Sequence, residues 1–220
     1  MTKSDFDFLT NSGVKIKQTQ NGYHFTSDAI QLAGFVKCSQ TDTVIDAGCG
    51  GCVISLIVND NHKPKTILAV DIHPEAITLA NENIALNNIT NIQTHCADIR
   101  EFHKTYGANR IDVLVCNPPY FSSGKKSENT VKATARHNDT LSLDDLCSAA
   151  TKLLKYSGDL YLCYPSSFTA HAIATLESHN FRVKQLKFIS NKKEIYLTLF
   201  HARKGGGHST KICLPTETLS

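Results

Sequence analysis

The sequence predicts an α/β protein with a mostly parallel sheet, helices on both faces and an antiparallel strand at one edge. From Thr43 onward, short apolar runs with strand character alternate with segments of helical spacing. That alternation is typical of strand–helix–strand units in a parallel sheet. Near the end of the chain, R-V-K-Q-L-K-F-I and E-I-Y-L-T-L-F follow one another without a helix between them. We therefore expect these two runs to pair antiparallel.

Seven strands are expected in order along the chain, each an apolar run of five to eight residues. They are T-V-I-D-A (43–47), T-I-L-A-V-D (66–71), N-I-Q-T-H-C-A-D (91–98), I-D-V-L-V-C (111–116), L-Y-L-C-Y (160–164) and the two late runs (182–189 and 194–200). Helices are expected over 52–58, 74–86, 143–155 and 168–176. Pro74 suits a first helical turn. Ser142 with Asp145 is a predicted N-cap, and Gly158 is expected to follow the end of that helix.

The first forty residues have a different pattern. V-K-I-K-Q-T-Q-N-G-Y-H-F alternates around Asn21-Gly22, which predicts a β-hairpin. Thr26 or Ser27 is then expected to cap the helix D-A-I-Q-L-A-G-F-V. We interpret residues 1–40 as a lid-like preface that belongs to the same domain as residues 41–220.

The composition is that of an ordinary globular protein, with 41% hydrophobic and 20% charged residues in 220. No apolar run approaches the roughly 20 residues that span a bilayer. The first residues lack the apolar core of a secretory signal, so we expect a cytoplasmic protein. The eight cysteines are scattered, which favours reduced, buried thiols over a disulfide framework. No ligands stand at zinc-like spacing, so no metal is expected.

Asp46-Ala47-Gly48-Cys49-Gly50-Gly51 joins the first strand to the first helix. Glycines there allow a tight turn and let a ligand lie against main-chain N–H groups. Asp71, at the end of the second strand, is placed to accept hydrogen bonds from ribose hydroxyls. Asp98, at the end of the third, is a candidate to bind an adenine amino group beside Ile99. Acids at three successive strand ends favour a nucleoside with little phosphate.

The same loop contains Cys49-Gly50-Gly51-Cys52, a C-x-x-C at a helix start. A redox dithiol there would have its thiolate stabilised by the helix N-terminus. We favour this alternative less, because nothing nearby resembles the rest of a thioredoxin-like unit.

The fourth strand ends in Asn117-Pro118-Pro119-Tyr120. The prolines cannot donate to a sheet ladder, so pairing stops there. The Asn117 side-chain oxygen and the Pro118 carbonyl are two acceptors that match the two hydrogens of an exocyclic amine, and Tyr120 offers a face for base stacking. Acceptors that stabilise charge growing on the nitrogen favour its attack on an electrophilic methyl group, without a strong base.

D-A-G-C-G, V-D-I, A-D-I and N-P-P-Y, in this order, resemble the class I S-adenosylmethionine-dependent methyltransferases that act on planar amide or amine nitrogens. The resemblance implies a Rossmann-like fold with a seven-stranded sheet and S-adenosylmethionine as cofactor. It implies cofactor contacts from Thr26, Asp28, Asp46, Gly48, Gly50, Asp71, Ile72, Asp98, Ile99 and Asn117, and a catalytic set of Asn117, Pro118, Pro119 and Tyr120. Cys52 stands where many members of the class have a third glycine.

The flanks G-Y-H-F-T-S-D-A-I-Q-L-A-G-F, A-R-H-N-D-T-L-S-L-D-D-L and A-R-K-G-G are similar to the bacterial tRNA(Val) adenine N6-methyltransferases. That resemblance implies methylation of the adenosine next to the anticodon. One alternative is a glutamine N-methyltransferase acting on release factors. Those enzymes also carry N-P-P-Y, but usually with a sizeable helical domain ahead of the glycine loop. Another nucleobase-amine methyltransferase, or a non-catalytic nucleotide-binding or redox protein, are further alternatives.

Positive charge concentrates near the end of the chain. Arg182 to Lys211 contains eight basic residues and one acid, a pattern that indicates a polyanion footprint or, alternatively, a solvated lysine-rich face. The stretch after Tyr120 is also polar and basic. The RNA contacts that we predict are Lys125, Lys126, Lys132, Arg136, Lys192, Lys193, Arg203 and Lys204. The expected partner is tRNA, with no membrane and no obligate protein partner.

Overall fold

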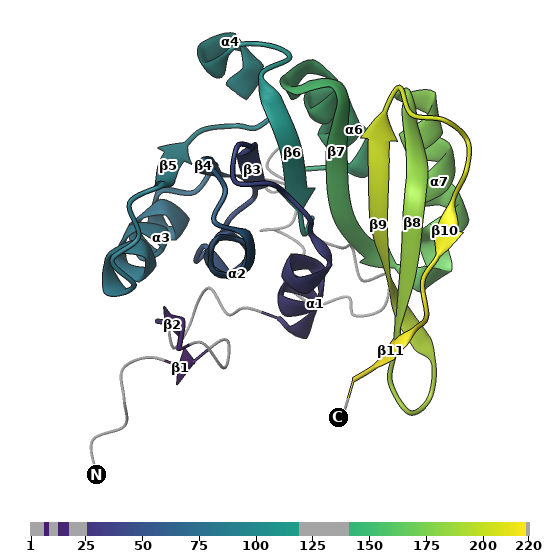
Figure 1. Ribbon diagram of the computed structural model, residues 1–220, viewed down its shortest axis with the longest axis horizontal. Helices are drawn as coiled ribbons and strands as arrows, with labels where there is room; N and C mark the ends of the chain where they lie inside the picture. The colour runs from purple at the N-terminus through teal and green to yellow at the C-terminus, as the bar shows by residue number, and fades with distance from the viewer. Residues whose placement is uncertain (1–6, 9–12, 18–25, 119–140, 219–220) are drawn as a thin grey trace, which may run out of the picture.

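The computed structural model describes residues 7–8, 13–17, 26–118 and 141–218. Its centre is a sheet of seven long strands (Figure 1) in the order β5-β4-β3-β6-β7-β9-β8. Their bounds are β3 Thr43–Ala47, β4 Thr66–Asp71, β5 Ile92–Cys96, β6 Ile111–Cys116, β7 Leu154–Pro165, β8 Phe181–Ser190 and β9 Ile195–Lys204. Each of the seven strands predicted from Thr43 onward is present, and the mostly parallel α/β architecture is confirmed.

The antiparallel strand is β9, and its position differs from the prediction. It pairs antiparallel with both β7 and β8, so it lies one place in from the edge. The chain passes from β7 through α7 to β8, which lies two strand positions away from β7. A short turn then leads from β8 into β9, and β9 occupies the position between β7 and β8. The edge strand β8 therefore runs parallel to β7.

Two short strands extend this edge. β10 (Lys211–Ile212) and β11 (Thr216–Glu217) both pair parallel with β8. Strands of two residues are too short to produce an alternating pattern, so they could not be predicted from the sequence.

Helices cover both faces of the sheet (Figure 1). α1 (Ser27–Phe35), α2 (Val53–His62) and α3 (Pro74–Leu86) lie on one face, and α4 (Phe102–Tyr106), α6 (Leu143–Leu153) and α7 (Thr169–Ser178) lie on the other. Alternate residues of each central strand point to opposite faces. In β3, for example, Val44 packs toward α1 and α2, whereas Ile45 packs toward α6 and α7. The central strands are apolar throughout because both faces are buried.

The helix starts follow the expected chemistry in two cases. α3 begins at Pro74. Ser142 Oγ accepts from the Asp145 N–H at 3.1 Å, and the Asp145 carboxylate accepts from the Ser142 N–H at 3.3 Å, which completes a capping box at α6. The expected role of Gly158 is wrong, because α6 passes directly into β7 at Leu154. Gly158 lies inside β7, where a Cβ would come within 3.2 Å of the Asp112 carbonyl oxygen.

The described part of the preface packs against the domain. β2 (Lys15–Ile16) pairs with β1 (Asp7–Phe8), and the Asn87 side chain bonds the main-chain N–H and carbonyl of Lys15. Thr26 is the N-cap residue of α1, but its side chain makes no capping bond. The expected hairpin turn at Asn21-Gly22 lies outside the described residues, and the lid-like role of residues 1–40 stays a prediction. Across the described ranges, no helix is both long and apolar enough to cross a membrane.

Candidate active site

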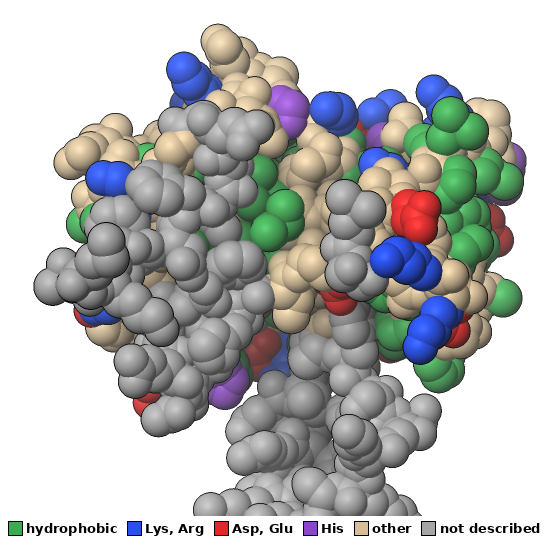
Figure 2. Space-filling view, turned by 90° about the horizontal axis from the view of Figure 1, so that it is seen from below, with side chains coloured by type: hydrophobic (Ala, Val, Ile, Leu, Met, Phe, Trp, Pro, Cys, Tyr) green, Lys and Arg blue, Asp and Glu red, His purple; other side chains and the backbone are tan. Residues whose placement is uncertain are grey.

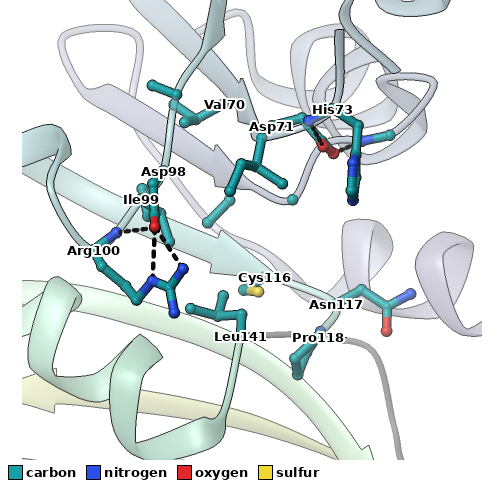
Figure 3. A pocket seen from close by; sticks show the side chains of 15 residues that line it. Val70, Asp71, His73, Asp98, Ile99, Arg100, Cys116, Asn117, Pro118 and Leu141 are labelled. Carbon is teal, nitrogen blue, oxygen red and sulfur yellow. Dashed lines mark hydrogen bonds and ion pairs between the residues drawn. The ribbon is translucent and has the colours of Figure 1, made fainter. Parts of the chain in front are cut away.

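A cavity of about 430 Å³ opens at the carboxyl ends of β3, β4, β5 and β6 (Figure 3). These four strands are parallel, so their carboxyl ends meet at one edge of the sheet, where ligands of open α/β folds bind. The cavity brings together most of the residues that the sequence singled out. Among its lining residues are Gly48, Gly50, Asp71, Ile72, Asp98, Ile99, Asn117 and Pro118.

Asp71 fixes the glycine loop from the end of β4. Its Oδ2 accepts from the Gly50 N–H at 2.9 Å, and its Oδ1 accepts from the His73 N–H at 3.0 Å. Gly48 and Gly50 have positive φ angles of 72° and 52°, which glycine adopts without strain. Each carboxylate oxygen can accept more than one hydrogen bond, so Asp71 retains acceptor capacity toward the cavity that it lines.

Cys52 stands where many class I methyltransferases have a third glycine, and the loop keeps the same backbone path with this larger residue. It adopts a left-handed conformation with a φ of 72° at the N-cap of α2, and it is fully buried. A residue with a Cβ holds this conformation at a cost of about 1–2 kcal/mol. The loop therefore keeps a glycine-like path with a cysteine in that place.

Asp46 lies beneath the cavity and does not line it. The carboxylate is fully buried and its Oδ2 accepts from the Ser55 N–H at 3.1 Å and from Ser55 Oγ at 2.7 Å. Its Oδ1 is buried and has no hydrogen-bond partner among the described residues. Burial raises the pKa of Asp46 to about 6, although the Ser55 hydrogen bonds oppose that shift. Its predicted cofactor contact would have to involve the unpartnered oxygen.

Asp98 forms an ion pair with Arg100 at the cavity wall (Figure 3). Arg100 donates from Nε to Asp98 Oδ2 at 2.8 Å and from its main-chain N–H to Oδ1 at 2.9 Å. These hydrogen bonds hold the pKa of Asp98 below its usual range. A carboxylate that stays ionised is a strong acceptor for an amine, so the pair is compatible with the predicted adenine contact.

Asn117 stands at the carboxyl end of β6 with its side chain held from β7. The Cys163 thiol donates to Asn117 Oδ1 across 3.0 Å, and Cys163 itself is fully buried. That bond orients the Asn117 side chain. Pro118 follows and is buried on the cavity wall. Pro119 and Tyr120, the other two predicted catalytic residues, lie outside the described residues.

Other predicted site residues are not brought to the cavity. Thr26 is exposed and Asp28 is half-buried at the start of α1, and neither lines it. Burial raises the pKa of Asp28, against a smaller effect of its hydrogen bond with Ser27. Their predicted cofactor contacts stay predictions, and Lys125, Lys126, Lys132 and Arg136 lie outside the described residues.

The four basic residues predicted in β9 and its preceding turn separate into two pairs. Lys192 and Lys193 are exposed in the turn between β8 and β9, at the carboxyl end of β8 and so at the edge that carries the cavity. Arg203 and Lys204 end the antiparallel β9 and lie at the opposite, amino-end edge. There Arg203 Nε donates to Asp159 Oδ1 at 2.8 Å, and Lys204 Nζ donates to the Leu154 carbonyl oxygen at 2.8 Å. Arg203 and Lys204 are therefore already engaged within the protein.

The C-x-x-C has the properties of packed thiols. Cys49 and Cys52 are both buried and reduced. A hydrogen bond with Cys52, together with burial, raises the pKa of Cys49 well above its ordinary value. A redox-active cysteine needs an exposed thiolate of lowered pKa, so the structure argues against the redox alternative.

The site residues predicted from the sequence did not include His73, Arg100 and Leu141, which line the cavity, or Cys163, which bonds to Asn117. Two of them, His73 and Arg100, follow sequence patterns that could have indicated them. In D-I-H-P and D-I-R, the main-chain N–H of the residue two places after the acid donates to its carboxylate, as in an Asx-turn. Cys163 and Leu141 come from segments distant in sequence, and only the folded sheet brings them to Asn117 and the cavity.

The cavity suits a nucleoside cofactor on three grounds. Its volume is within the range of small-molecule sites, which is about 300–1,000 Å³. A Cβ at Gly48 would meet no protein atom within 4 Å, so the loop leaves open space on its ligand side. Among the described residues, the polar side chains of the wall are two carboxylates, one carboxamide, one imidazole and the Arg100 guanidinium, which is paired with Asp98. The carboxylates suit hydroxyls and amines better than phosphates.

Residues 39–204 match the family model described as a methyltransferase domain, so the chain belongs to that family. Within it, the chain belongs with the tRNA1(Val) (adenine(37)-N6)-methyltransferases. It is 31% identical over 176 residues to the protein of that name from Shewanella woodyi, which covers 78% of this chain and 72% of that one. It is 28% identical over 204 residues to the protein of that name from Vibrio campbellii, with 89% and 84% covered.

A solved structure supports the fold. A predicted O-methyltransferase from Agrobacterium tumefaciens superposes with a TM-score of 0.67 at 18% identity, over 88% of this chain and 89% of that one. At this identity, the likeness confirms the class I methyltransferase fold that the sequence predicted.

Proposed function

We propose that the protein transfers a methyl group from S-adenosylmethionine to the N6 amine of an adenosine in the anticodon loop of a tRNA, next to the anticodon of tRNA(Val). The observation that carries this proposal is the position of Asn117. An oriented carboxamide stands at the end of β6, beside a nucleoside-sized cavity. The names of the relatives point to the same reaction.

The cofactor supplies a methyl group on a positively charged sulfur, which makes that carbon electrophilic. Asp71 is assigned to the ribose hydroxyls, because its carboxylate lines the cavity and retains acceptor capacity. Asp98 and the adjacent Ile99 main chain are assigned to the adenine ring, and Ile72 to its face. The glycine loop, from Gly48 to Gly50, lets the amino acid end of the cofactor approach the main chain, above the unpartnered Oδ1 of Asp46.

Asn117 and the Pro118 carbonyl are assigned to the substrate amine. The lone pair of an adenine N6 is delocalised into the ring, so the amine is a weak nucleophile. Two acceptors aimed at its hydrogens favour a pyramidal nitrogen and stabilise the positive charge that grows on it during attack. Neither acceptor is basic enough to keep the released proton, which passes to solvent. We keep Tyr120 as the expected stacking partner of the base.

An anticodon loop makes its bases available at low cost, because they are unpaired and can be turned out of the stack. We also infer that the exposed pair Lys192 and Lys193 contacts the RNA, since it lies at the edge of the sheet that carries Asn117. A tRNA substrate agrees with the expected cytoplasmic location, which imaging of a tagged protein tests.

The test is nucleoside mass spectrometry after incubation of purified protein, isotope-labelled S-adenosylmethionine and tRNA. We expect labelled N6-methyladenosine in tRNA(Val), and none when the target adenosine is replaced by guanosine. A parallel reaction with release factors tests the alternative substrate. Label in a release-factor glutamine with none in tRNA would contradict the proposal.

A further inference from the structure

We propose that an aromatic–basic surface at the same edge of the sheet as Asn117 binds the unpaired nucleotides that flank the reactive adenosine. The surface consists of Tyr164, Phe168, Lys192, Lys193 and Ile195. It is a binding surface for single-stranded RNA, and this inference rests on the proposed function, whose substrate it describes in more detail.

The surface begins at the carboxyl end of β7, the strand that pairs with β6. Cys163 of β7 bonds to Asn117, whereas Tyr164, the next residue, packs toward the α6 and α7 face of the sheet. After Pro165 a single 3-10 turn, η2 (Ser166–Phe168), carries Phe168 out from the sheet. The rings of Tyr164 and Phe168 meet edge to face with centroids 6.3 Å apart. The side chain of Phe168 is nevertheless 45% exposed.

Specific hydrogen bonds join η2 to the neighbouring strand. Ser166 Oγ donates to the Ile195 carbonyl oxygen at 2.6 Å, and the hydroxyls of Thr169 and Thr198 lie 2.8 Å apart. These bonds join η2 to the start of β9, where the side chain of Ile195 is 48% exposed. Two large exposed hydrophobic residues, Phe168 and Ile195, therefore lie at the edge that carries the lysines of the β8–β9 turn.

The adjoining turn presents its two lysines in a fixed geometry. Asn191 Oδ1 accepts from the Lys193 N–H at 2.8 Å and from the Glu194 N–H at 3.0 Å, while the Asn191 N–H donates to the Glu194 carbonyl oxygen at 3.0 Å. Lys192 and Lys193 are exposed beyond this closed turn. Figure 2, which views this edge from below, shows Lys and Arg side chains beside hydrophobic and acidic ones over this part of the sheet.

Aromatic faces combined with lysines are the chemistry of single-strand nucleic acid binding. Bases stack on the rings, and the lysines neutralise the phosphates between them. A protein partner would need a larger continuous apolar area, and it would gain little from cations around two separate apolar residues. Paired RNA would offer no free base faces. The unpaired loop that contains the target adenosine meets both requirements.

The test measures binding of a fluorescent anticodon stem–loop in the presence of S-adenosylhomocysteine. Phe168→Ala is compared with Tyr156→Ala, which removes an exposed aromatic ring near the amino end of β7, the strand that leads into η2. We expect Phe168→Ala to weaken binding about tenfold, the scale of one lost base stack, and Tyr156→Ala to change it less than twofold. Phe168→Leu, which keeps apolar bulk, should resemble Phe168→Ala, whereas Phe168→Tyr should bind normally.

A base-paired hairpin that lacks the unpaired loop is the second probe. Its weaker, charge-driven binding should not change in Phe168→Ala. If Phe168→Ala and Tyr156→Ala bind the stem–loop equally, while the unaltered protein methylates tRNA, the surface is wrong and the proposed function stands. If the unaltered protein neither binds the stem–loop nor methylates tRNA, both are wrong.

Discussion

The two edges of the central sheet use polar and charged residues in opposite ways. At the amino-end edge, charges are paired inside the protein: Asp112 with Lys155, and Asp159 with His201 and Arg203. Lys204 there donates to the carbonyl oxygens of Thr151 and Leu154. At the carboxyl-end edge, Asp71 and Asn117 line an open cavity and the lysines of the β8–β9 turn are exposed.

This difference shows that the position of a charge along the chain does not reveal its use. Lys193 and Arg203 are ten residues apart in one basic segment, yet one is exposed at the cavity edge and the other completes a bidentate pair with Asp159. Strand direction separates them, because β9 carries the chain from one edge of the sheet to the other. A basic side chain that is already paired within the protein, such as Arg203, is not available to bind RNA, whereas an exposed one, such as Lys193, is.

The largest expected effect is on the rate of methyl transfer, and it is tested by replacing one asparagine at each edge. Asn117→Ala should lower the rate of methyl transfer by at least several tens of fold, the scale of losing one oriented transition-state contact, and leave cofactor affinity nearly unchanged. Asn91→Ala is the matched control. Its amide bonds to Asn59 and to the Pro64 carbonyl at the amino-end edge, so it should affect only stability. Near-normal single-turnover rates in Asn117→Ala would contradict the assignment.

A second comparison uses one acid from each edge. Asp71→Ala should weaken S-adenosylmethionine binding at least tenfold, because the ribose hydroxyls lose a charged acceptor and the loop loses the bond to Gly50. Asp112→Ala removes the partner of Lys155 and of the Thr43 N–H, and should leave cofactor affinity unchanged. Calorimetric titration measures both. Equal cofactor affinity in the Asp71 variant and the unaltered protein would contradict the assignment of Asp71 to the ribose hydroxyls.

A third comparison tests whether the hydrogen bond from the Cys163 thiol orients Asn117 for catalysis. Cys163→Ala removes the donor that orients the Asn117 amide, so we expect a several-fold lower kcat with an unchanged KM for the cofactor. Cys163→Ser supplies another donor and should restore most of the rate. Cys147→Ala is the control for the loss of a buried thiol, since Cys147 lies in α6. If serine and alanine variants have the same low kcat, the thiol acts through packing alone.

Asp46 gives a pH-dependent prediction for stability. Its pKa is about 6 in the folded protein and near 3.8 in the unfolded chain. The folded state therefore binds more protons between these values, and the stability of the protein falls as pH rises from about 4 to 6. Above pH 6 the buried charge costs up to about 3 kcal/mol. Asp46→Asn, which can still accept from Ser55, should melt at a higher temperature at pH 7.5 but not at pH 4.

The same variant tests the unpartnered oxygen of Asp46. If this oxygen receives a hydrogen bond from the cofactor, Asp46→Asn should bind S-adenosylmethionine more weakly while being more stable. Melting curves at several pH values and cofactor titrations check both effects. A variant with a lower melting temperature at pH 7.5 would mean that the carboxylate stabilises the fold.

The sequence predicted the fold well because each strand is an apolar run closed by a polar or turn residue. Asp71, Asp98 and Asn117 each follow such a run, so their convergence at one edge followed from the parallel arrangement alone. The position of β9 could not be predicted in this way, because a hairpin between β8 and β9 can form with β9 on either side of β8. Nor did the sequence reveal that Asp46 is covered by Ser55, or that Lys204 binds the end of α6, because both depend on packing between distant segments.

The most direct test of the contrast between the two edges is the salt dependence of tRNA binding in two double variants. Lys192→Ala/Lys193→Ala should lower the slope of log affinity against log salt by up to about two, one for each lost phosphate contact. Arg203→Gln/Lys204→Gln should leave that slope unchanged and lower the melting temperature instead. If the second variant lowers the slope and the first does not, the RNA binds at the amino-end edge, which would contradict the assignment of RNA binding to Lys192 and Lys193.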